Sequence, residues 1–173
     1  DNIDEYDTII FAHDDVTIED RLLFKKVAAG LVKHDIIGLA GGKNLKLDHP
    51  ALWHLMCDQQ SWSGAVAHPF EGGDKILVTT FGPSPQRCLL LDGLFLAVRV
   101  KSLKDSPKVK FDEEIPCIAH FYDLDFCLTA NENGFKLSTW PIWAMHNSPG
   151  LTEYSEEFRG GALYFIDKWT NRK

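Results

Sequence analysis

The 173 residues lack the features that mark several specialised classes of protein. No apolar run approaches the roughly 18 residues that a transmembrane helix needs, and no signal peptide opens the chain. There is no repeat, linker or low-complexity segment. The net charge is −7 and no basic stripe is present, so the electrostatic footprint of a nucleic-acid-binding protein is missing. We therefore expect a cytoplasmic protein with no transmembrane segment and no nucleic-acid partner.

Closely spaced cysteine pairs, which bind metals or form redox-active disulfides, are missing from the sequence as well. None of the four cysteines belongs to a C-x-x-C motif, and each lies among apolar residues: Cys57, Cys88, Cys117 and Cys127. This pattern favours buried free thiols over a disulfide framework. The remaining composition, 45% hydrophobic and 25% charged, is that of an ordinary globular protein. It predicts a single domain over residues 1–173 with a substantial core.

Hydrophobic periodicity predicts an α/β fold. Residues 7–12 and 36–40 are short apolar runs typical of buried strands, and apolar residues at helical spacing lie between them. A strand, a helix and a strand within about 35 residues suggest a right-handed parallel crossover. The pattern also predicts helices at 123–133, ended by Gly134, and at 154–169.

Acidic and imidazole side chains occur in three clusters at the ends of predicted strands or at a helix start. The clusters are His13-Asp14-Asp15, Asp123-Leu124-Asp125 and His146. In open α/β sheets, ligands bind at the carboxyl ends of strands, and adjacent carboxylates can hold a divalent cation. Each cluster taken singly has a structural alternative: a helix cap, a complement to the helix dipole, or a hydrogen-bonding histidine.

In combination, the clusters resemble a known family. The strings F-x-H-D-D-V, G-L-A-G-G, D-G-L-F-L-A-V-R, H-F-Y-D-L-D-F-C-L-x-A and H-x-S-x-G follow one another between Asp7 and Trp169. They resemble the family-2 glycosyltransferases of the GT-A fold, in the branch that carries H-D-D in place of Asp-x-Asp. The resemblance implies a GT-A-like sheet, mixed but mostly parallel and flanked by helices. It implies an inverting transfer of a sugar from a nucleotide-sugar donor to the hydroxyl of an acceptor such as a carbohydrate.

The resemblance also implies catalytic and metal-binding roles. Asp15 and His146 would ligate a Mg²⁺ or Mn²⁺ ion, which neutralises the leaving nucleoside diphosphate. Asp123 would take the proton from the acceptor hydroxyl, and Asp125 would support that base or the helix start. We therefore expect the side chains of Asp15 and His146 within roughly 8 Å of each other. We expect Asp123 at a helix N-terminus that faces the same cleft.

Five further residues would contact the donor in the same family. His13 and Asp14 would lie near the ribose or the diphosphate. Asp92 and Gly93 would lie under the donor sugar, and Trp62 would stack on a sugar face.

The chain departs from the family pattern in two places. Thr129 stands where the family usually has Arg after the Cys-Leu pair. Only six residues precede the strand at 7–12, where family members carry two or three strand–helix units that hold the nucleotide base. We therefore expect a fold that is incomplete at its N-terminus and binds nucleoside diphosphates weakly. The strand is apolar on both faces, as in a central strand, and its second edge needs a later strand, missing residues or a second copy of the chain in a homo-oligomer.

Two other functions use the same residues. A metal-dependent phosphohydrolase would release phosphate without any acceptor. A non-catalytic module that binds carbohydrate or a partner chain would fold without metal or turnover.

Overall fold

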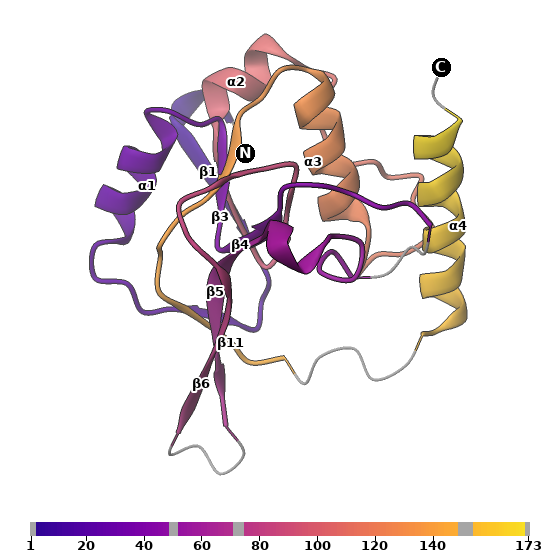
Figure 1. Ribbon diagram of the computed structural model, residues 1–173. Coiled ribbons are helices and arrows are strands. Elements are labelled where there is room, and N and C mark those ends of the chain that lie inside the picture. Colours follow the sequence, from indigo (N-terminus) through magenta and orange to yellow (C-terminus); the bar gives the residue numbers. More distant parts are fainter. Residues whose placement is uncertain (1–2, 49–51, 71–74, 149–153, 172–173) are drawn as a thin grey trace.

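The computed structural model describes residues 3–48, 52–70, 75–148 and 154–171. Pro149 and Gly150, which end the H-x-S-x-G string, lie outside the described residues. Two mixed β-sheets form the centre, with α-helices on either side (Figure 1). The first sheet contains, in spatial order, β1 (Thr8–Ala12), β9 (Phe95–Arg99), β3 (Ile36–Gly38), β10 (Leu137–Thr139) and β7 (Arg87–Cys88). The second contains β2 (Val16–Ile18), β11 (Ala144–His146), β5 (Trp62–Pro69), β4 (Ala40–Gly42) and β8 (Leu90–Leu91), with β6 (Ile76–Gly82) paired to β5.

The mixed α/β architecture is confirmed, but the expectation of a mostly parallel sheet is wrong. Among the described strands, only the pairs β3–β10 and β5–β11 are parallel. The physical reason lies in β9, which runs between β1 and β3 and is antiparallel to both. β1 and β3 are therefore parallel to each other, as the strand–helix–strand pattern predicted, but they are not neighbours. The side chains of residues 95–98 are fully buried, which suits β9 to this central position.

The strand predicted at 7–12 is present as β1, but the described strand beside it is β9 and not the strand at 36–40. Within the described residues β1 forms the edge of its sheet, and Thr8 to Phe11 are only half-buried. The Phe11 ring packs edge-on against Phe111 at 5.0 Å and against Phe126 at 6.4 Å between centroids. An edge strand that is covered by aromatic side chains therefore has the same apolar sequence as a central strand.

Four α-helices are described: α1 (Leu23–Leu31), α2 (Val100–Asp105), α3 (Tyr122–Glu132) and α4 (Glu156–Thr170), with short 3-10 turns at Ile3–Glu5 and Gln59–Ser61. The helices predicted at 123–133 and 154–169 are thus confirmed. α1 lies on one side of the sheets, and α3 and α4 lie together on the other (Figure 1). No described helix combines the length and the apolar character that crossing a membrane would need. All four cysteines are buried and free, as predicted.

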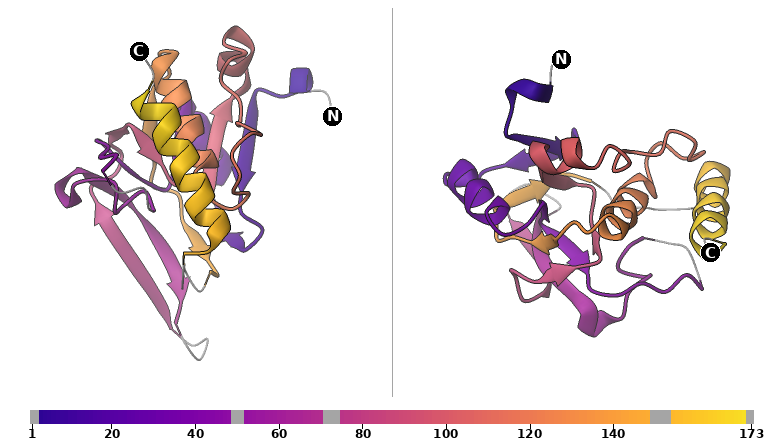
Figure 2. Two further views of the ribbon diagram at one scale, coloured as in Figure 1. Left: turned by 90° about the vertical axis from the view of Figure 1, so that its right-hand side faces the viewer. Right: turned by 90° about the horizontal axis from the view of Figure 1, so that it is seen from above.

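The strands β5 and β6 form a long antiparallel hairpin. Their register runs from Ala65 opposite Thr80 to Pro69 opposite Ile76. The hairpin projects from the body of the molecule in two perpendicular views (Figures 1 and 2). At the base of the hairpin β5 pairs with β4 through residues 62–64, and further along it pairs with β11 at Ala67, so the hairpin belongs to the second sheet.

Candidate metal centre and adjoining cavity

Strand pairing brings together two parts of the chain that lie far apart in sequence. β2 and β11 pair antiparallel, with His146 opposite Val16. The amide of Asn147 donates a hydrogen bond to the carbonyl of Asp15 at 2.9 Å. As a result, Nε2 of His146 lies 3.2 Å from Oδ1 of Asp15. The predicted proximity of Asp15 and His146 is confirmed.

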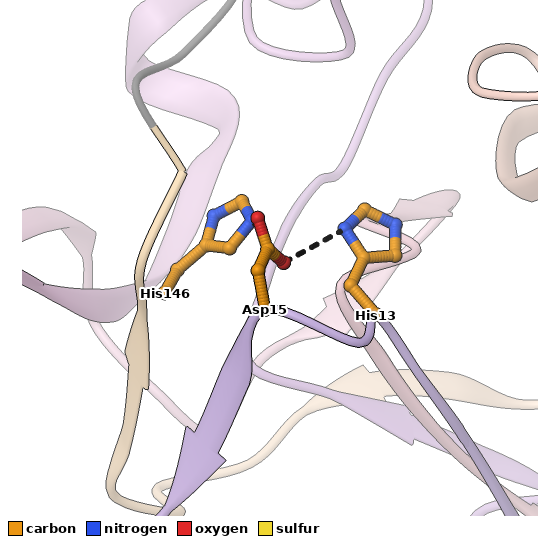
Figure 3. A group of neighbouring side chains, drawn as sticks. All are labelled: His13, Asp15 and His146. Atoms are coloured by element: carbon orange, nitrogen blue, oxygen red, sulfur yellow. Dashed lines mark ion pairs between the residues drawn. The ribbon is translucent and has the colours of Figure 1, made fainter.

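His13 completes a group of three. Its backbone amide donates to the carbonyl of Leu94 at 3.1 Å, which fixes the end of β1 beside the start of β9. Its Nδ1 lies 4.0 Å from Oδ1 of Asp15. One potential ligand atom from each of His13, Asp15 and His146 lies within 4.8 Å of the others. Asp15 stands between the two imidazole rings (Figure 3).

These three residues, the triad, fit a divalent cation. Oδ1 of Asp15 is buried and forms no hydrogen bond with the described residues, although His146 Nε2 is close to it. A buried carboxylate oxygen without a partner calls for an explanation, and a bound ion is one. Two imidazoles and one carboxylate suit a transition-metal ion better than Mg²⁺, which prefers oxygen ligands alone. Of the two ions expected from the sequence, this ligand set favours Mn²⁺. The triad thus contains the two predicted ligands and adds His13, which had been expected near the ribose or diphosphate.

Tyr122 orients the imidazole of His13. Its hydroxyl lies 2.6 Å from Nε2 of His13. Histidine ligands are usually held in this way through their second ring nitrogen. In the tautomer in which Nε2–H donates to Tyr122, the lone pair of Nδ1 faces Asp15. Burial, with the charges of Asp123 and Asp92 nearby, raises the pKa of Tyr122 and keeps the phenol neutral.

Asp123 lies in the first turn of α3, as predicted. Its Oδ2 accepts a hydrogen bond from the amide of Gly93 at 2.8 Å. Burial, together with the negative charge of Asp92, raises the pKa of Asp123 to about 7. A carboxylate with a pKa near neutrality, in a cavity wall, is suited to proton transfer.

The triad and Asp123 line one cavity of about 330 Å³, so the predicted common cleft is confirmed. The other walls are largely aromatic or imidazole-bearing and include Leu52, Trp53, His54, Asp92, His120 and Phe121. Burial lowers the pKa of His54 and the pKa of His120, which favours their neutral forms. Neither histidine was identified in the sequence, because a lone histidine carries no local signal of the cavity it faces.

Asp92 lines the cavity, and Gly93, the next residue, lies against the start of α3 without being among the described lining residues. Asp92 accepts hydrogen bonds from Nε1 of Trp53 at 2.7 Å and from the amide of Leu94 at 3.0 Å. At Gly93, an added Cβ would lie 2.4 Å from the Tyr122 hydroxyl and 2.7 Å from Cβ of Asp123. Only glycine fits where the backbone approaches α3 this closely.

Two residues expected at the donor site lie elsewhere. Asp14 is exposed, and neither it nor Trp62 is among the described residues that line the cavity. Nε1 of Trp62 donates to the carbonyl of His54 at 2.9 Å, and its ring lies edge-on to Trp53 at 6.3 Å. Trp62 therefore packs behind the cavity wall, and the tryptophan that lines the cavity is Trp53.

Asp125 has a different environment from Asp123, two residues away. It is 1% exposed and is not among the described lining residues of the cavity. Its carboxylate lies 2.7 Å from Nζ of Lys168 and accepts a hydrogen bond from Nε1 of Trp169 at 2.8 Å. Lys168 also bonds Asp112. The structure thus places Asp125 in a buried ionic network that ties α4 to α3.

Phe121 connects α4 to the cavity. It precedes α3 with a φ of +69°, in the left-handed region that a bulky residue rarely adopts. The side chain is buried against Phe158 and Phe165 of α4, with ring centroids 4.9 Å and 5.7 Å away. Strained residues of this kind cluster at functional sites. Here the conformation turns the chain so that both Tyr122 and Asp123 reach the cavity.

A scan of protein-family models finds none that matches the chain, and a search of curated proteins finds no relative. The geometry of the cavity is therefore the main ground for assigning a function.

Proposed function

We propose that the chain is a GT-A-like, metal-dependent inverting glycosyltransferase domain that moves a sugar from a nucleotide-sugar donor to a hydroxyl acceptor. The observation that carries the proposal is the joint presence, in one cavity, of the His13–Asp15–His146 triad and of Asp123. The sequence strings that resemble the family supply residues from four separate segments to this cavity. Convergence of these segments on one site supports a common chemical task.

The triad would hold the divalent cation, and the ion when bound would neutralise charge on the leaving nucleoside diphosphate. Asp123 accepts the proton of the acceptor hydroxyl. With a pKa near 7, it is partly ionised at neutral pH and is a stronger base than an ordinary carboxylate. The chemistry uses one base and no protein nucleophile, so the anomeric carbon is inverted in a single displacement.

The aromatic walls suit a sugar. Trp53 and Phe121 offer apolar surface, while Asp92 and the two neutral histidines offer hydrogen-bonding groups. Binding sites for small molecules combine such surface with a few convergent polar groups. The volume of about 330 Å³ is at the small end of the range for ligand pockets, which fits one sugar ring and not a whole nucleotide-sugar.

The test is a transfer assay on the purified chain with Mn²⁺, a panel of nucleotide-sugars at millimolar concentration and a panel of sugar acceptors. We expect release of nucleoside diphosphate that depends on the acceptor. Asp123→Asn should lower turnover by about 100-fold or more and leave Mn²⁺ binding intact. Thr129→Ala is a matched control on the same helix and should keep full activity.

Two results would overturn the proposal. Release of phosphate without an acceptor, abolished by Asp123→Asn, would indicate a phosphohydrolase. A folded chain that binds Mn²⁺ and a sugar but turns over no donor in the panel would indicate a binding module.

A further inference from the structure

Two histidines in the cavity wall have imidazole nitrogens that bind no other part of the described chain. His54 comes from the segment between β4 and β5, and His120 lies two residues before α3 begins. Within the described residues, neither imidazole takes part in a hydrogen bond or an ion pair. Neither is among the buried polar atoms that lack a partner, so a ligand in the cavity can reach these nitrogens.

Aromatic neighbours fix the orientation of both rings. The His120 ring lies edge-on to Phe158 of α4, with centroids 5.1 Å apart. The His54 ring lies edge-on to Trp53 at 5.6 Å and to Trp62 at 5.9 Å. Polar groups that are held in place before a ligand arrives bind it at a lower entropic cost.

Other polar groups of the wall already have partners inside the protein. Asp92 accepts hydrogen bonds from Trp53 and from the amide of Leu94, and the Tyr122 hydroxyl contacts His13. His54 and His120 are different because their partners must come from a ligand or from water. Since burial favours their neutral forms, each imidazole offers one donor and one acceptor. A hydroxyl group, which both donates and accepts, is complementary to either nitrogen.

The charges in the wall restrict the ligand further. Asp92 and Asp123 both line the cavity, and its described lining contains no lysine or arginine. An acidic group on the ligand would therefore approach two aspartates without a basic side chain to pair with. Juxtaposed like charges disfavour such a complex. The cavity suits a ligand that has many hydroxyl groups and no negative charge of its own.

We propose that His54 and His120 determine the specificity of the cavity by hydrogen-bonding the hydroxyl groups of an uncharged sugar ring. The inference rests on the proposed function, which brings a sugar into this cavity, and it adds the class of sugar. Neutral hexoses bind, and sugars that carry a carboxylate or a phosphate on the ring are rejected. The two histidines act in binding, whereas Asp123 acts in proton transfer.

The first test is titration calorimetry of the whole chain with methyl glucoside, methyl galactoside and methyl mannoside. His54→Phe and His120→Phe keep an aromatic ring against the neighbouring side chains and remove only the ring nitrogens. Each should weaken binding of the preferred hexoside by about 10-fold, as expected for the loss of a hydrogen bond. His34→Phe is the matched control, because the His34 imidazole bonds the carbonyl of Gly30 and is not among the described lining residues. Its affinity for the hexoside should be unchanged.

Deoxy sugars test the hydrogen bonds themselves. If His120 binds one hydroxyl of the ring, the analogue that lacks this hydroxyl should bind the natural chain about 10-fold more weakly. The same analogue should bind His120→Phe as well as the parent hexoside does, because the partner of the hydroxyl is already gone. A merely structural role of His120 would weaken both sugars equally.

A pair of ligands tests the charge selection without any variant. The methyl glycosides of glucuronic acid and of its amide differ only in the carboxylate, and the amide should bind at least about 10-fold more tightly. A chelating buffer is used, so that no ion bound at the triad attracts the carboxylate.

Three outcomes would overturn the proposal. They are the absence of binding for all three hexosides, hexoside binding that neither His54→Phe nor His120→Phe weakens, and equal affinity for the glucuronide and its amide. All three are binding measurements made without a donor. A chain that passes them but transfers no sugar would uphold this proposal and overturn the proposed function.

Discussion

The amide of Gly93 donates a 2.8 Å hydrogen bond to Oδ2 of Asp123 and joins the turn before β9 to the first turn of α3. The same glycine lies against the hydroxyl of Tyr122, which in turn contacts His13. The proposed base and the candidate metal centre therefore share one backbone support.

Replacing Gly93 by alanine should disturb both halves of the site at once. The added Cβ would lie 2.4 Å from the Tyr122 hydroxyl and 2.7 Å from Cβ of Asp123, so both side chains must move. Overpacking of this kind costs about 1–3 kcal/mol of the free energy of unfolding. We expect a lower Tm and weaker Mn²⁺ binding by calorimetry. Gly160→Ala is the control, since its Cβ would meet no described atom closer than 3.8 Å. Normal Mn²⁺ affinity in Gly93→Ala would contradict this coupling.

Neighbouring aspartates provide a sharp test of the metal centre. Asp15→Asn removes a charged ligand from the triad and should lower Mn²⁺ affinity by 10-fold or more. Asp14→Asn changes the same charge one residue away, at an exposed position outside the described cavity lining, and should leave affinity within about two-fold, as expected for screened surface charge. Titration calorimetry of both variants measures the difference. Equal losses in the two variants would point to a diffuse acidic surface in place of a defined site.

Tyr122→Phe should weaken metal binding without unfolding the chain. The substitution removes only the hydroxyl that lies 2.6 Å from Nε2 of His13. Loss of such an outer partner typically costs 10- to 100-fold in metal affinity. The control is Tyr164→Phe, which removes a hydroxyl that bonds Asp112 in the α4 network. The thermal stability of Tyr164→Phe should fall while its Mn²⁺ binding stays normal. Weaker Mn²⁺ binding in Tyr164→Phe than in Tyr122→Phe would contradict the role of Tyr122 in orienting His13.

The two acids of the Y-D-L-D string should respond in opposite directions to substitution by asparagine. The pKa of Asp123 is raised to about 7 in the folded chain, so the folded state binds a proton more tightly than the unfolded state. The natural chain therefore loses stability as the pH rises from about 4 to about 7. Asp123→Asn removes this loss, and the free energy of unfolding at pH 8 should exceed that of the natural chain by about 1 kcal/mol or more.

Asp125→Asn should instead destabilise the chain. It leaves the ammonium group of Lys168 in a mostly buried network with one carboxylate fewer. Breaking a buried ion pair in this way typically costs about 3–5 kcal/mol. Urea unfolding at pH 5 and pH 8 measures both variants. A gain of stability in Asp125→Asn, or a loss in Asp123→Asn that is larger at pH 8 than at pH 5, would reverse the assignment of the two acids.

Local patterns in the sequence were sufficient for some of these features. The apolar run at 7–12 and the helices at 123–133 and 154–169 depend on short-range periodicity, and all three are present. The approach of Asp15 to His146 was expected from the resemblance of the H-D-D and H-x-S-x-G strings to the glycosyltransferase family, because neither cluster alone indicates a shared site.

Other features depend on contacts between distant segments. The insertion of β9 between β1 and β3 is a matter of strand order, which periodicity does not encode. The choice of Trp53 over Trp62 for the cavity wall depends on tertiary packing, since both are tryptophans in one stretch. The positive φ of Phe121 runs against the intrinsic preference of phenylalanine, so no propensity could have predicted it.

The positive φ of Phe121 has a consequence for local unfolding around the cavity. Residues in the left-handed region cost roughly 1 kcal/mol or more and persist only when surrounding contacts compensate. For Phe121 those contacts come from α4, where Gly161 allows the Phe121 ring to within 3.0 Å of the position a Cβ would take. When α4 detaches in a local unfolding event, Phe121 loses the contacts that hold it at a positive φ and can relax to a more favourable conformation. The first turn of α3, which follows Phe121 directly, is then no longer held in place. The lifetime of an ordered cavity is therefore no longer than the residence time of the C-terminal helix on the body of the protein.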